Sequence, residues 1–198
     1  MRLPIVAVLL ALTLATPVWA DEVTDQIGEA RKLYERGKYS EAVKELQFVI
    51  NEIHGKLSGR FVGSLPPAPP GWTAEEVETQ GMAMMGGGQV ITRAYREESG
   101  EGSVKAQLVV DSPMIQGLAM MLNNPAMLGA QGRMKRVRIK RENALLKWNR
   151  WRRSGELSVI LGNGRLLIQI EGRDVTKEVL TRLMKSWDFD KAKRIAGL

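Results

Sequence analysis

A proline-rich stretch divides this chain into two parts that differ in hydrophobic period. The run from Pro66 to Gly71 cannot continue a helix, so residues 58–71 read as a stiff linker. Apolar residues recur at helical spacing before this stretch and largely at alternate positions after it. The sequence therefore predicts an α+β protein, with a helical hairpin in residues 21–57 and a sheet domain in residues 72–198.

The first twenty residues have the order of a cleavable signal peptide. Arg2 precedes an apolar run from Leu3 to Leu14, and the small residue Ala20 stands before Asp21. The run is shorter than the roughly 20 residues of a membrane-spanning helix. We therefore expect cleavage after Ala20 and a periplasmic or secreted protein.

Charge and cysteine content narrow the classes of partner. There is no cysteine, so disulfides and a lipid-modified cysteine are excluded. The chain carries a net charge of +7, and loss of Arg2 with the signal leaves 28 basic against 22 acidic residues. This balance favours anionic partners such as lipid head groups or acidic proteins. We expect no nucleic-acid partner, because nucleic acid is the least available of these outside the cytoplasm.

Residues 22 to about 54 predict two helices around a tight turn at Gly37. The first helix ends at Arg36 and the second opens at Ser40, a favourable N-cap residue. Short connections place successive helices side by side in antiparallel fashion. The second helix is expected to carry its apolar residues on one face: Ala42, Val43, Leu46, Val49, Ile50 and Ile53.

The hairpin resembles a single tetratricopeptide repeat, on the residues Ala30, Leu33, Tyr34, Gly37, Tyr39, Ala42, Leu46 and Val49. A lone repeat of this kind cannot bury its apolar face by itself. It must pack on the rest of the chain, on another copy or on a partner. We expect a protein partner, with Tyr34, Tyr39 and Leu46 as contacts.

The second part predicts an antiparallel sheet of five or six strands with helices on one face. The pair Asn163-Gly164 between two β-branched runs is a strong hairpin signal. A helix from Met114 to about Leu122 is apolar nearly all round and is expected to be buried, and a last helix follows Asp174. The expected strands are Val90–Tyr95, Val104–Val110, Met134–Lys140, Ala144–Trp151, Glu156–Leu161 and Arg165–Glu171.

The order of these elements is similar to the PsbP-like fold. The resemblance covers residues 65 to 190, from the opening Pro69-Pro70-Gly71-Trp72 to the final helix. That fold is shared by the extrinsic lumenal protein of photosystem II and a nuclear import regulator. The resemblance implies a binding or accessory role, because members of the fold are mostly not enzymes.

Catalytic and metal-binding residue types are scarce. The only histidine, His54, lies near the expected C-terminal end of a helix, where a histidine interacts favourably with the helix dipole. With no cysteine, an ordinary zinc site is not expected, and neither is a catalytic residue or a cofactor. A weaker alternative is copper handling by the thioethers of Met82, Met84 and Met85. Methionine also fills irregular cores, which is the simpler interpretation.

A basic segment is the clearest surface signal. Ten basic residues and one acid lie between Arg133 and Arg153, beside Trp148 and Trp151. Their alternate spacing predicts that Arg136, Arg138 and Lys140 share one face of the sheet. The segment could bind anionic lipid or cell-wall polymers, or be a solvated face paired with the chain's own acids. The candidate anion-binding residues are Arg136, Arg138, Lys140, Lys147, Arg150 and Arg152.

Overall fold

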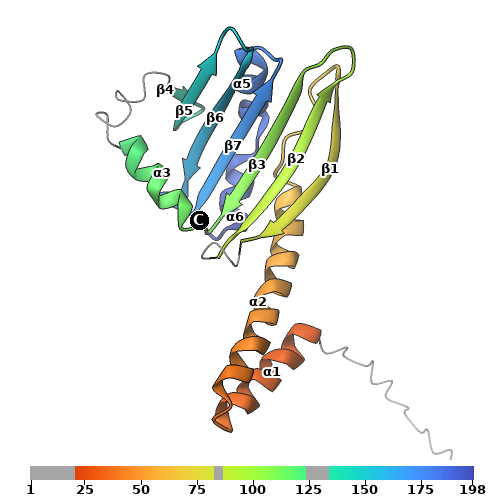
Figure 1. Ribbon diagram of the computed structural model, residues 1–198, viewed down its shortest axis with the longest axis vertical. Helices are drawn as coiled ribbons and strands as arrows, with labels where there is room; N and C mark the ends of the chain where they lie inside the picture. Colours follow the sequence, from red (N-terminus) through yellow and green to blue (C-terminus); the bar gives the residue numbers. More distant parts are fainter. Residues whose placement is uncertain (1–20, 83–86, 124–133) are drawn as a thin grey trace, which may run out of the picture. The chain divides into compact units, whose positions relative to one another are not determined.

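The computed structural model describes residues 21–82, 87–123 and 134–198 (Figure 1). The expected signal peptide, residues 1–20, lies outside them. The chain divides into two compact units, one ending at Val49 and the other beginning at Ile50. Within the described ranges, no helix is both long and apolar enough to cross a membrane.

The first unit contains the expected helical hairpin. Helix α1 spans Glu22–Glu35, and helix α2 spans Tyr39–Val62 and leaves the unit after Val49. Gly37 joins them with a φ of +74°, a conformation that glycine adopts without strain. The side chains buried here come from both helices, as in two helices that pack together: Val23, Ala30, Leu33, Ala42 and Val49.

Helix α2 is longer than the sequence indicates. It passes through Gly55 and Gly59 and ends at Val62, so the expected end near His54 was wrong and the first residues of the expected linker are helical. Phe61 is fully buried in the core of the second unit. Packing of this helix end compensates for the low helix propensity of glycine. Only residues 63–71 remain as a connection.

The second unit is built on one antiparallel sheet of seven strands. Six of them are expected from the sequence, and β1, at the edge beside β2, is the addition. The order across the sheet is β1-β2-β3-β7-β6-β5-β4 (Figure 1). The strands are β1 (Trp72–Gly81), β2 (Gln89–Glu97), β3 (Ser103–Val110), β4 (Met134–Ile139), β5 (Glu142–Asn149), β6 (Ser154–Leu161) and β7 (Leu166–Arg173).

The turn between β6 and β7 confirms the hairpin expected at Asn163-Gly164. Leu161 pairs with Leu166 across it. Three of the four turn residues, Gly162, Asn163 and Gly164, have positive φ, which glycine and asparagine tolerate best. Local turn chemistry therefore fixes the register of this pair of strands.

The main core lies between one face of the sheet and helices α5 (Lys177–Ser186) and α6 (Phe189–Ile195). Leu180, Leu183 and Met184 of α5 and the following Trp187 are almost completely buried, as expected for the last helix. They pack on alternate residues of the strands, such as Ile168 of β7. The α+β class and the antiparallel sheet are thus as the sequence predicts.

Helix α3 (Met114–Asn123) lies on the opposite face of the sheet and covers one corner of it (Figure 1). Ile115 is buried there with Val109 of β3 and Leu167 of β7. Met114 and Met120 are exposed, so the expectation of a helix buried all round was wrong. A single sheet face can cover only one side of a helix. The rest of this sheet face carries polar side chains, such as the paired Thr92, Gln107 and Gln169, and is called the open face below.

Candidate functional site

The hairpin exposes several large apolar side chains. Tyr34 is 64% exposed, Tyr39 61%, Val43 62% and Leu46 44%. The rings of Tyr34, at the end of α1, and Tyr39, at the start of α2, lie 5.4 Å apart between centroids. These four residues are called the hairpin face. Isolated exposed apolar residues are common, but a contiguous group of this size is typical of an interaction surface.

Helix α2 carries two apolar stripes instead of the single face expected. Ala42 and Val49, seven residues apart, are buried in the hairpin. Tyr39, Val43 and Leu46 form the neighbouring stripe, because residues three and four apart lie above one another on a helix. Of the predicted partner-binding residues, Tyr34, Tyr39 and Leu46 are all accessible, and Val43 joins them.

The predicted anion-binding residues do not form one group. Arg136 and Arg138 of β4 and Lys147 of β5 lie on the open face, on the side opposite the buried Ala144 and Leu146. All three are exposed. They occupy the sheet edge formed by β4 and β5.

Lys140 faces the other side of the sheet, so its assignment to the same face as Arg136 and Arg138 was wrong. Strand β4 ends at Ile139, and Lys140 has a φ of +53°, which breaks the alternation. Its ammonium donates a hydrogen bond to the carbonyl of Trp187 at 2.7 Å and lies 4.9 Å from the ring centroid of Phe189. This lysine therefore holds the sheet to the α5–α6 connection.

The remaining two predicted residues, Arg150 and Arg152, lie in the turn between β5 and β6 and are exposed. A shallow hollow of about 560 Å³ lies beside this turn. Its lining brings Arg152 and Lys147 together with Arg173 of β7, a residue that sequence analysis did not select. Glu156 and Glu171 line the same hollow, so its charge is mixed.

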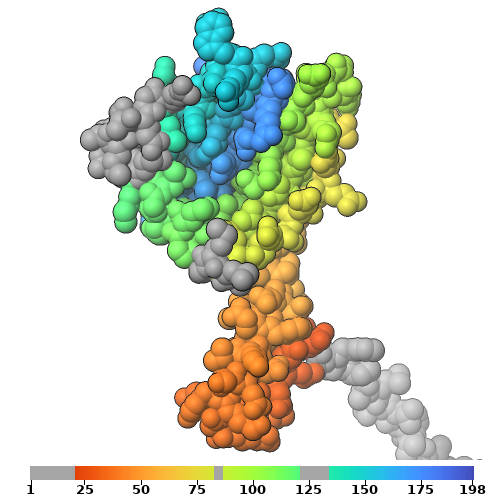
Figure 2. All heavy atoms as spheres, in the orientation of Figure 1, coloured from red at the N-terminus to blue at the C-terminus, as the bar shows by residue number. Residues whose placement is uncertain are grey.

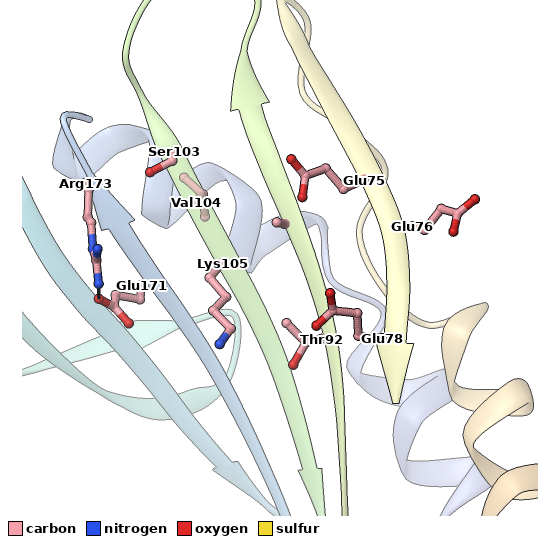
Figure 3. A pocket seen from close by; sticks show the side chains of 10 residues that line it. Glu75, Glu76, Glu78, Thr92, Ser103, Val104, Lys105, Glu171 and Arg173 are labelled. Carbon is pink, nitrogen blue, oxygen red and sulfur yellow. Dashed lines mark hydrogen bonds and ion pairs between the residues drawn. The ribbon is translucent and has the colours of Figure 1, made fainter. Parts of the chain in front are cut away.

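A second hollow, of about 270 Å³, lies on the open face over β1, β2, β3 and β7 (Figure 3). Lys105 of β3 stands in its floor. Glu78 of β1 points toward it from one side, with Glu171 of β7 on the other, whereas Glu76 points away. Side chains of both signs alternate here, which matches a solvated sheet face.

Metal-ligating side chains do not gather into a cluster in the described residues. Among them, no group of three histidine, aspartate or glutamate side chains could hold a metal ion. Met82 is buried with Val109 and Ile115 in a small core under α3, so packing accounts for it. The other two methionines of the copper hypothesis, Met84 and Met85, lie outside the described residues. His54 lies inside α2 and not at its end, and lines a hollow of about 340 Å³.

Comparisons with protein-family models, with curated proteins and with solved structures find no match to this chain.

Proposed function

We propose that this chain is an exported, non-enzymatic binding or accessory protein that binds a protein partner through the hairpin face. The observation that carries the proposal is the exposure of Tyr34, Tyr39, Val43 and Leu46 on two adjoining helix ends. Aromatic and aliphatic side chains that are held on helices contribute strongly when a partner covers them. The periplasm or the extracellular space is the proposed location, on the strength of residues 1–20.

The spacing of the apolar residues favours a helix as the partner's binding element. Tyr39, Val43 and Leu46 follow one another at four and three residues, the spacing with which one helix packs along another. The likeness to a tetratricopeptide repeat supports the same choice, because such repeats bury their apolar faces against neighbouring helices.

Site-specific photo-cross-linking in cells tests the proposal. A photoreactive amino acid at Val43 should give a defined adduct, whereas the same group at the adjacent exposed Lys44 should give little. The double variant V43S/L46S should lose the partner, and the matched variant K44S/Q47S, one position further along α2, should retain it. Equal adducts at both positions, or a partner retained by V43S/L46S, would contradict the proposal.

Sedimentation velocity of the purified protein then identifies one class of partner. A dimer that V43S/L46S converts to a monomer would show that the partner is a second copy. A monomer, together with a cross-linked adduct in cells, would show that the partner is another protein.

A second candidate function is the binding of an anionic surface, either lipid head groups or cell-wall polymers. It is favoured by the exposed positions of Arg136, Arg138 and Lys147 on the open face and of Arg152 beside them. Exposed charges are screened over about 8 Å at physiological ionic strength, so this binding should weaken steeply with added salt. Binding that salt leaves unchanged would exclude this function.

A further inference from the structure

The turn between β5 and β6 presents one tryptophan to solvent. Strand β5 ends at Asn149 and β6 begins at Ser154, and residues 150–153 are called the tryptophan turn below. Trp151 is 95% exposed, the highest value among the large apolar residues that the structure describes. By contrast, Trp187 is fully buried, and Trp72 and Trp148 are half-buried on the main core. An indole is the largest apolar side chain, so its complete exposure on a folded domain requires an explanation.

The backbone of this turn is held in place. The Asn149 side-chain oxygen accepts hydrogen bonds from the backbone N–H groups of Trp151, at 3.0 Å, and Arg152, at 3.1 Å. On the other side, the carbonyl of Arg153 accepts a hydrogen bond from the N–H of Val175 at 2.9 Å. The exposure of Trp151 is therefore imposed by a fixed turn.

Only cationic side chains flank Trp151 within the turn. Arg150, Arg152 and Arg153 are all exposed. Arg153 donates a hydrogen bond to the backbone carbonyl of Asp174 at 3.3 Å. Glu156, Glu171 and Asp174 line the hollow beside Arg152, but they lie on β6, on β7 and just after β7, outside the turn. The turn itself, residues 150–153, therefore carries three positive charges and no acid.

We propose that the tryptophan turn inserts Trp151 into the interface of an anionic lipid bilayer, with Arg150 and Arg152 on the lipid phosphates. Tryptophan is enriched at the level of the head groups, where its ring meets acyl chains and its N–H meets water. Basic residues beside it are attracted to anionic lipids. The turn projects from the end of the sheet, in cyan in Figure 2. Because charged residues surround the projecting tip, a protein partner would find no apolar surface around the indole to bind. Insertion of the indole into a bilayer does not require such a surface.

This inference deepens the second candidate function and relies on it for the anionic surface. It differs in requiring penetration of an indole into the bilayer. Head groups or cell-wall polymers could bind the open face without that step, so the two proposals can fail separately.

Quenching by brominated lipids measures the penetration directly. Vesicles containing phosphatidylglycerol with bromine on its acyl chains should quench the tryptophan fluorescence of the wild-type protein. The variant W151A should lose this quenching but keep its circular dichroism spectrum, because Trp151 packs on almost nothing. Vesicles of phosphatidylcholine alone should bind weakly.

A pair of charge-matched variants tests the role of the arginines. R150Q/R152Q should bind these vesicles roughly 25-fold more weakly, because each basic residue near an anionic leaflet strengthens binding roughly fivefold. R182Q/K185Q, which removes two exposed charges from α5, should have a much smaller effect.

Three outcomes would overturn the inference. In the first, the protein binds phosphatidylglycerol vesicles without quenching, which leaves the second candidate function intact. In the second, it binds a soluble anionic polymer but no vesicle. In the third, W151A is quenched as strongly as the wild-type protein.

Discussion

A substitution at Tyr95 tests how the connection between α2 and the sheet is held in place. The Tyr95 hydroxyl is buried and donates a hydrogen bond to the carbonyl of Pro66 at 2.7 Å, so it fastens the proline-rich connection to β2. Burial raises the pKa of Tyr95 to about 12, although the nearby Arg93 acts in the opposite direction. The variant Y95F is therefore compared with the wild-type protein as the pH is raised.

Near neutral pH, Y95F should lower the free energy of unfolding by about 1 to 2 kcal/mol, because it removes one buried hydrogen bond and leaves the Pro66 carbonyl unpaired. A group whose folded pKa is raised stabilises the fold below its unfolded pKa, which is about 10 for tyrosine. This contribution is lost as the pH rises from about 10 through the folded value of about 12. At about pH 11 the wild-type protein has lost about 1 kcal/mol that Y95F does not lose.

The test is urea unfolding of the wild-type protein and of Y95F from about pH 8 to about pH 11. The quantity compared is the difference between their free energies of unfolding. All other side chains are the same in both proteins, so the effect of pH on them cancels in the difference. The difference should shrink by about 1 kcal/mol over this range. A difference that stays constant with pH would show that the Tyr95 phenol is not buried in its neutral form. A difference that grows with pH would show that the pKa of Tyr95 is lowered by folding and not raised.

Three further changes have clear expected results. F61A should destabilise the second unit by about 3 to 5 kcal/mol in urea unfolding, because Phe61 is fully buried in the main core. G172A should destabilise it by about 1 to 3 kcal/mol in the same assay, since a Cβ there would lie 2.5 Å from Val175 and 2.6 Å from Leu180. Intact mass of the exported protein should give Asp21 as its first residue, and retention of residues 1–20 would refute the signal peptide.

Most of the sheet could be predicted because its strands follow local rules. Periodicity and turn chemistry located six strands, including the pair around Asn163. Strand β1 was missed because Trp72–Gly81 contains three glutamates and only two strongly apolar residues. It is an edge strand with one polar face, and only its pairing with β2 reveals it.

The end of α2 could not be predicted for a similar reason. Gly55 and Gly59 reduce the local helix propensity, and the compensating contacts of Phe61 come from the sheet, far away in sequence.

The candidate surfaces were predicted only in part. Alternation correctly placed Arg136 and Arg138 on one face, but it failed at Lys140, where the backbone leaves the strand with a positive φ. Arg173 lies far from the basic segment in sequence and joins it only through the order of the strands. Sequence periodicity also could not distinguish the buried apolar stripe of α2 from the exposed one, because burial of a stripe depends on where α1 packs.

The strand order divides the sheet into two meanders, β1 to β3 and β4 to β7, joined by a single ladder between β3 and β7. Forming that ladder closes a loop that contains α3 and β4 to β6, so it carries the largest entropic cost of assembling the sheet. The two meanders are each contiguous in sequence. A chain cut between Asn123 and Met134 should therefore be able to reassemble from two co-expressed fragments, with the β3–β7 ladder as their shared edge.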